Sequence, residues 1–218
     1  YAAIRDHYPG VPLVIIDDGS DRKRVGSMAP HTRYDSSASV VENVAHPGAA
    51  EIVAYAYLRE ARPFREALVL HDSMMVREPL APPDEPVRFL WHFRHQFDRP
   101  HDEMRLLLKL PSRKRMRLYE LFVRKHRWWG CFGSAAFVSL DAVDKVQKEH
   151  QYFDLLRHVR DRAARLCMER IFACVMTYEF PGLALRPSLF GDIMQYPRTW
   201  GYSFEQFLEE GEPRFLPI

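Results

Sequence analysis

Acidic side chains follow two apolar runs of the sequence, and acids in such places are suited to bind a cation or to move a proton. The first run, 11–16, is followed by Asp17, Asp18, Gly19 and Ser20, and the second, 67–70, by His71, Asp72 and Ser73. Short apolar runs rich in β-branched residues and closed by turn residues are typical of buried strands. Because ligands of open α/β sheets sit beyond the carboxyl ends of the strands, these residues are predicted to line a ligand site.

The elements that must position these side chains alternate between strand and helix. A helix is expected from Pro47-Gly48 through Leu58, between the two apolar runs. Two strand-to-carboxylate units predict a mainly parallel sheet with right-handed crossovers, and the alternating run 87–93 predicts a half-buried antiparallel strand. From Asp141 to about Tyr178, apolar residues recur with the period of a helix. The prediction is an α/β fold with a helical C-terminal half.

Three segments, in chain order, resemble the signatures of glycosyltransferases of the GT-A fold. Val-Ile-Ile-Asp-Asp-Gly-Ser at 14–20 resembles the strand end whose Asp touches the base or ribose of a sugar nucleotide. His-Asp-Ser at 71–73 matches one carboxylate of the family's Asp-x-Asp motif, and Phe-Gly-Ser-Ala at 132–135 resembles its glycine-containing pocket segment. Taken alone, the first segment fits a strand with an Asp-Gly turn equally well.

The resemblance extends over about 11–170 and implies one GT-A-like, Rossmann-like domain over 1–218. Its nucleotide-binding α/β part would span 1–140 and its mostly helical acceptor-side part 141–218. The strand that opens the fold in this family has no counterpart in this sequence. The sequence is therefore either truncated or different from the family at a place that contacts the nucleotide.

The resemblance also implies a divalent metal, Mn²⁺ or Mg²⁺, on the donor diphosphate. Asp72 would be a ligand, and His71 would be either a second ligand or a hydrogen-bonded core residue. A hard cation on oxygen ligands stabilises the negative charge that gathers on a diphosphate leaving group. Because only one carboxylate of the motif is matched, a cationic side chain such as Arg77 is an alternative holder of the diphosphate.

The remaining site residues follow from the same resemblance. The nucleotide would contact Asp17, Asp18, Gly19 and Ser20, and the donor and acceptor pocket would be lined by Ser73, Trp129, Phe132, Gly133 and Ser134. Glu169 matches the carboxylate that takes the proton of the acceptor hydroxyl. Two ordinary interpretations stay open: the aromatic residues belong to the core, and Glu169 is a solvent-exposed partner of Arg165 one helical turn earlier.

Composition narrows the class of protein. The chain has 218 residues, 47% of them apolar, and a net charge of +2, which does not favour a nucleic-acid partner. The basic run 113–117 is interpreted as a solvated helix face, with phosphate binding beside Trp128-Trp129 as the alternative. No apolar run is long enough for a membrane span, so a soluble, cytoplasmic protein is expected. Three cysteines with core-like spacing predict neither a disulfide framework nor a zinc site.

The resemblance implies a glycosyltransferase, a hexosyl- or pentosyltransferase acting on a nucleotide-sugar donor and a glycan, protein or small-molecule acceptor. The first alternative is a non-catalytic nucleotide-sugar-binding domain of the same fold. The second is an interaction protein that uses an α/β scaffold. A nucleotidyltransferase is disfavoured, because its two metals would need a carboxylate pair that the segment 71–73 does not provide.

Overall fold

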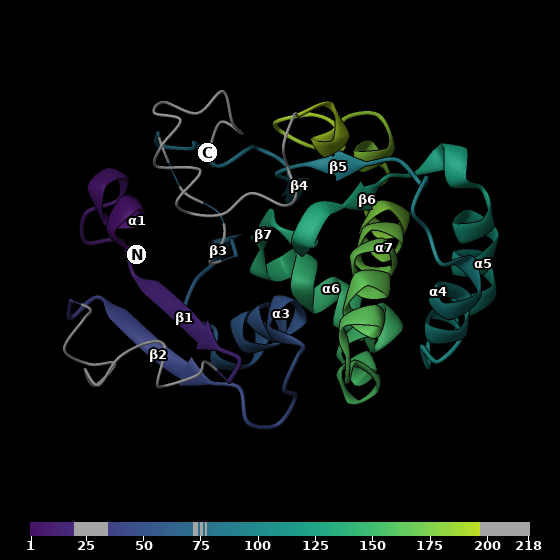
Figure 1. The fold of residues 1–218 in the computed structure, drawn as a ribbon, viewed down its shortest axis with the longest axis horizontal. Coiled ribbons are helices and arrows are strands. Elements are labelled where there is room, and N and C mark those ends of the chain that lie inside the picture. Colours follow the sequence, from purple (N-terminus) through teal and green to yellow (C-terminus); the bar gives the residue numbers. More distant parts are fainter. Residues whose placement is uncertain (20–34, 72–73, 75, 77, 197–218) are drawn as a thin grey trace.

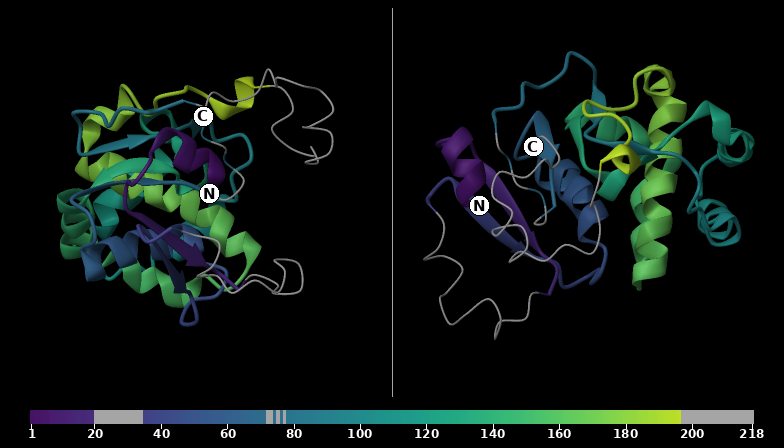
Figure 2. Two further views of the ribbon diagram at one scale, coloured as in Figure 1. Left: turned by 90° about the vertical axis from the view of Figure 1, so that its left-hand side faces the viewer. Right: turned by 45° about the horizontal axis from the view of Figure 1, so that its top comes forward.

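The computed structural model describes residues 1–19, 35–71, 74, 76 and 78–196 (Figure 1). It is a mixed α/β structure with small sheets. Strands β1 and β2 lie at one edge of the molecule, helices α4 and α5 lie at the opposite edge, and helices α3 and α7 lie between them (Figures 1 and 2). No helix among the described residues has the length and apolar character needed to cross a membrane.

The first apolar run forms a strand as predicted. Strand β1 spans Leu13–Asp17 and pairs in parallel with β2, Ala38–Glu42, with Leu13 opposite Ala38 and Asp17 opposite Glu42. A short helix, α1 (Ala2–His7), precedes β1. Helix α3, Ala50–Ala61, follows the second strand at the place where the apolar helical spacing predicts it.

The other strand pairings are antiparallel. Strand β7 (Ala136–Ser139) lies between β3 (Glu66–Val69) and β4 (Val87–Phe89) and pairs antiparallel with both. Strands β5 (His92–Phe93) and β6 (Gly130–Cys131) form a third, antiparallel pair. The antiparallel prediction for 87–93 is therefore confirmed, although β4 and β5 divide that run between them.

The described strands do not form the mainly parallel sheet that was predicted. Their parallel pair is β1 with β2, whereas β3 pairs with β7, a strand from much later in the chain. An apolar run indicates that a strand is buried, but strand direction depends on which segment becomes its neighbour. The repeated pattern of an apolar run followed by a carboxylate therefore predicted where strands form, but it did not predict how they pair.

Helices dominate the second half of the described chain, as predicted. They are α4 (Pro100–Leu107), α5 (Arg115–Val123), α6 (Leu140–His150) and α7 (Arg162–Glu179), with short 3₁₀ turns at η2 (Lys125–Arg127), η3 (Phe132–Ser134), η4 (Tyr152–His158), η5 (Pro181–Ala184) and η6 (Ile193–Gln195). Ser139 caps helix α6, because its hydroxyl group accepts a hydrogen bond from Ala142 N at 3.2 Å.

Helix α7 is the centre of the core. Its residues from Cys167 to Thr177 are all buried, and the larger apolar cluster is built around them. A helix that is buried on all sides has no solvent face for a charged residue. Glu169 and Arg170 lie within this buried stretch, so their charges must be met by protein groups.

Candidate active site

Asp18 joins the end of β1 to the segment that leads into α3. Its Oδ1 accepts hydrogen bonds from Asn43 Nδ2 at 2.6 Å and from the backbone N–H of Gly48 at 3.0 Å. Asp17 accepts from Asn43 N through its backbone oxygen, at 2.8 Å. Gly19 has a φ of 85°, a backbone conformation that favours glycine. The turn therefore holds the carboxyl group of Asp18 and the backbone of Asp17, while Ser20 lies outside the described residues.

His71 and Gly133 are brought together by the pairing of β3 with β7. Val69 lies opposite Ala136 in the register, so the residues just beyond them meet at the same end of this sheet. The His71 ring contacts the Gly133 carbonyl oxygen through Nε2. A Cβ at Gly133 would lie 2.7 Å from His71 Cε1, and the φ of Gly133 is 58°. Glycine is required here by both the close approach and the backbone conformation.

Glu169 extends this contact from helix α7. Its Oε1 accepts a hydrogen bond from Gly133 N at 3.3 Å, and its Oε2 accepts one from Arg170 Nη1 at 3.1 Å. Glu169 is only 8% exposed, so its interpretation as a solvent-exposed partner of Arg165 is wrong. Both backbone polar groups of Gly133 are thus engaged within the protein. The close approach that this glycine allows is that of the His71 ring.

Glu51 is a further member of the group formed by His71, Gly133 and Glu169, and it was not predicted from the sequence. It lies in the first turn of α3, and its Oε1 is 3.8 Å from both His71 Nδ1 and Arg165 Nε. Its Oε2 is buried and has no hydrogen-bond partner among the described residues. The one signal in the sequence was that Glu51 lies four residues, about one helical turn, before Tyr55. Tyr55 is buried, and its hydroxyl group donates a hydrogen bond to the backbone oxygen of Ser134.

Burial raises the pKa of the carboxyl groups of Glu51 and Glu169 into the neutral range. The pKa of Glu51 is raised to about 8 by desolvation and by the charge of Glu169, while Arg165 opposes the rise. Desolvation raises the pKa of Glu169 to about 7 against the opposing effects of Arg170 and the Gly133 hydrogen bond. The negative charge of Asp18 also raises the pKa of Glu51, so Asp18 interacts electrostatically with this site. The site therefore offers carboxyl groups suited to proton transfer near pH 7.

An ionic cluster behind Glu169 fixes the position of Arg170. The Arg170 Nε lies 3.0 Å from Asp98 Oδ1 and 3.4 Å from Glu103 Oε1, and Lys125 Nζ binds the same two acids. Burial alone would raise the pKa of Asp98, but hydrogen bonds from His95 and Lys125 lower it to about 2. Arg170 is thus held by charged partners on one side while it donates to Glu169 on the other.

Several predicted pocket residues have other partners. The Trp129 indole donates to the Ala184 carbonyl at 3.3 Å, and its ring packs edge-on against His92 at 4.6 Å between centroids. Phe132 packs against the smaller apolar cluster. Ser134 is fully buried, and its Oγ has no hydrogen-bond partner among the described residues. Of the predicted pocket, Gly133 and its neighbour Ser134 adjoin the site, whereas Trp129 lies elsewhere.

The described residues do not by themselves fit a divalent metal ion. A carbonyl oxygen only accepts, so His71 Nε2 must donate its proton to Gly133, and its Nδ1 faces Glu51. Across the described ranges, no three His, Cys, Asp or Glu side chains are grouped closely enough to hold a metal ion. Asp72, the main predicted ligand, and Ser73 lie outside those ranges.

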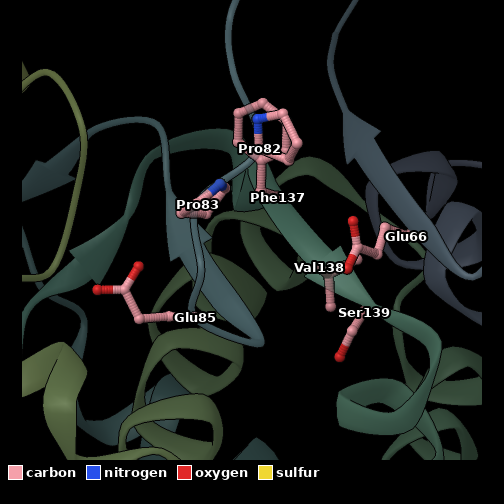
Figure 3. Close-up of a pocket in the computed structure, with 7 residues that line it drawn as sticks. All are labelled: Glu66, Pro82, Pro83, Glu85, Phe137, Val138 and Ser139. Carbon is pink, nitrogen blue, oxygen red and sulfur yellow. The ribbon is translucent and has the colours of Figure 1, made fainter.

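A shallow depression lies at the other end of the same sheet. It is lined by Glu66, Pro82, Pro83, Glu85, Phe137, Val138 and Ser139 (Figure 3). Glu66 is paired with Ser139 at the end of the β3–β7 ladder opposite to Val69 and Ala136. Figure 3 shows prolines on one side of it and carboxylates that do not converge. It contains none of the residues around Gly133, and its side chains suggest no chemistry.

Comparison of the chain with protein-family models, with curated proteins and with solved structures finds no significant match.

Proposed function

We propose that the protein is a glycosyltransferase that moves a sugar from a nucleoside-diphosphate sugar to an acceptor hydroxyl at the site around Gly133. The observation that supports this best is the meeting of segments that the resemblance assigned to one site. Gly133 of η3 donates to a buried carboxyl group on α7, Glu169, whose pKa is about 7, and His71 from the end of β3 contacts the same glycine. Asp18 from the end of β1 acts on this group of residues through its charge, which raises the pKa of Glu51. A general base is most effective when its pKa lies near the working pH.

In this proposal Glu169 takes the proton of the acceptor hydroxyl. The acceptor oxygen then bonds to the anomeric carbon while the bond from that carbon to the diphosphate breaks, and the nucleoside diphosphate leaves. Each Glu169 oxygen accepts a hydrogen bond, Oε1 from Gly133 N and Oε2 from Arg170, and retains a second lone pair for the incoming proton. Asp17 and Asp18 are proposed to contact the nucleoside, because the turn at the end of β1 holds them in place.

A GT-A-like arrangement of the sheet belongs to the same proposal. Its support is the parallel pair of β1 and β2, followed by helix α3, which carries Glu51. Glu51 lies 3.8 Å from His71 beyond β3, and its pKa is raised by Asp18 beyond β1. Glu51 therefore links the end of β1, through the charge of Asp18, with His71 just beyond β3, which supports a shared donor site at these strand ends.

A divalent metal on the donor diphosphate also stays part of the proposal, through Asp72. Bound there, Mn²⁺ or Mg²⁺ would supply positive charge to the leaving group. Because the described residues do not fit an ion by themselves, the proton-transfer role of Glu169 is proposed without one.

The experiment that tests the proposal measures donor hydrolysis and sugar transfer with a panel of nucleoside-diphosphate sugars, with and without Mn²⁺. We expect Glu169→Gln to lower turnover by about 10²- to 10⁴-fold, the usual contribution of a general base. Glu179→Gln is the matched control, because Glu179 is a buried acid on the same helix that bonds His150, Lys114 and Lys145 instead. It should retain most of the turnover.

Three outcomes separate the alternatives. Equal turnover by Glu169→Gln and the unsubstituted protein would remove the general-base role. Tight binding of nucleotide sugars without any turnover would favour the non-catalytic binding domain. A chain that binds no nucleotide at all would be an interaction protein with this scaffold, and the proposed function would be wrong.

A further inference from the structure

Positive charge is concentrated in one segment at the edge of the molecule. Residues 105–127 contain nine Lys and Arg and a single acid, Glu120, although the whole chain carries a net charge of only +2. The segment runs from the end of α4 through α5 and η2. Figure 1 and the right-hand view of Figure 2 both show α4 and α5 as the outermost helices on their side. The charge therefore lies on a projecting part of the fold.

The outer side of this segment combines arginines with apolar side chains. We call it the basic face, and it consists of Arg113, Met116, Arg117, Val123, Arg124 and Arg127. Met116, Arg117 and Val123 lie on α5, on the side that faces away from the buried Leu118 and Phe122. Arg113 precedes this helix, Arg124 follows it and Arg127 lies in η2, and all six side chains are exposed. Met116 is 60% exposed and Val123 is 52% exposed.

The arginines of the basic face differ from the lysines beside them. Lys114 binds Glu149 and Glu179, and Lys125 binds Asp98 and Glu103, so both lysines are neutralised by the protein. Within the described residues, no carboxylate forms an ion pair with any arginine of the basic face. Exposed cations that outnumber the nearby acids and form no ion pair attract anionic partners from solution.

We propose that the basic face docks on a bilayer leaflet that contains anionic lipids. Basic side chains near such a surface are attracted to it, and exposed apolar side chains between them enter the boundary of headgroups and acyl chains. The observations favour a lipid surface over a nucleic acid, because both tryptophans beside the basic face are engaged within the protein. Trp129 is half-buried, with its ring against His92 and Arg94. Trp128 is 1% exposed, and its ring is covered by Lys125 at 4.6 Å from the centroid. The proposal does not rest on the glycosyltransferase function.

The test is co-sedimentation of the full chain with vesicles of phosphatidylcholine, with and without phosphatidylserine, over a series of salt concentrations. We expect binding only when phosphatidylserine is present, and weaker binding as salt rises. The variant Arg113→Gln/Arg117→Gln/Arg124→Gln should bind about a hundredfold more weakly, since each basic residue at an anionic surface contributes about fivefold. If this variant does not fold, Arg117→Gln alone should show the single fivefold loss.

The matched control removes three exposed arginines from other parts of the molecule, Arg62→Gln/Arg65→Gln/Arg186→Gln. The same change in net charge should leave vesicle binding nearly unaltered. Met116→Ser/Val123→Ser should weaken binding severalfold and keep its salt dependence. The proposal is overturned if the unsubstituted chain ignores phosphatidylserine vesicles, if the control variant loses as much binding as the basic-face variant, or if the basic face binds RNA and no vesicle.

Discussion

The carboxyl groups of Glu51 and Glu169 both have a raised pKa, but they lose their protons at different pH values. Glu51 and Glu169 come from different helices, and the charge of Glu169 raises the pKa of Glu51. Because the pKa of Glu51 is about 8 and that of Glu169 about 7, Glu51 keeps its proton to higher pH. Such neighbours titrate as a pair. At neutral pH the arrangement leaves Glu169 as the carboxylate that can accept a proton.

The raised pKa of Glu51 predicts that the folded chain loses stability in alkali. A carboxyl group with a higher pKa in the folded than in the unfolded chain binds its proton more tightly when folded. The free energy of unfolding therefore falls as the pH rises from about 4.5 through about 8. Glutamine does not titrate, so Glu51→Gln should remove part of this fall, on the order of a few kcal/mol.

Urea unfolding followed by circular dichroism at pH 5 and pH 9 measures the effect. Glu66→Gln is the control, because Glu66 is exposed at the start of β3. It should show the same fall between the two pH values as the unsubstituted chain. An equally large fall in Glu51→Gln would mean that Glu51 is not held protonated by burial.

Sequence alone could identify some residues of this site but not others. Asp18 and His71 were predicted because each follows an apolar run, and Gly133 and Glu169 because of the family resemblance. Glu51 could not be found in this way, since its neighbours His71 and Arg165 come from other elements. The burial of a charged helical residue depends on tertiary packing, which helical periodicity does not report.

At the scale of elements, the turn η3 determines the geometry of the site. It lies between β6 and β7 and receives His71 from the end of β3 and Glu169 from α7. Tyr55 from α3 holds the same turn through the Ser134 carbonyl. Because three elements contact it, a small change in this turn should disturb the whole site.

The variant Gly133→Ala tests this role of the turn. Its Cβ would lie 2.7 Å from His71 Cε1 at a φ of 58°, so we expect a loss of about 2–4 kcal/mol in the free energy of unfolding. Removing the ring in Gly133→Ala/His71→Ala should recover the part that is due to the clash. Gly182→Ala is the control, because no atom lies within 4 Å of the position that its added methyl group would occupy.

Chemical denaturation of the three variants and the unsubstituted protein gives the comparison. Equal losses in Gly133→Ala and in the double variant would show that the ring does not limit this position. A loss in Gly182→Ala as large as that in Gly133→Ala would show that neither effect is specific to the turn.

The elements themselves were more predictable than their pairing. Apolar runs marked β1 and β3, and helical spacing marked α3 and α7. Strand direction was not predictable, because β7 enters between β3 and β4 from a distant part of the chain. Local patterns record burial, whereas the neighbour of a strand is a property of the fold.

At the scale of the whole molecule, the chain is nearly neutral, but its charges are unevenly distributed. The net charge of +2 suggested no strong field, yet segment 105–127 carries nine basic residues and projects at one edge. The site around Gly133 is linked to that segment from the inside, because Glu169 accepts from Arg170, and Asp98 binds both Arg170 and Lys125. Composition averages over such regions, so it predicts neither the basic face nor this link.

The most direct measurement of the central claim is a crystal structure with a nucleoside-diphosphate sugar and Mn²⁺ bound. The account predicts the base or ribose beside Asp17 and Asp18, and the sugar near Gly133 with Glu169 facing the anomeric carbon. Ligand bound in the depression lined by Glu66 and Glu85, or no ligand at saturating concentration, would contradict the assignment of this site.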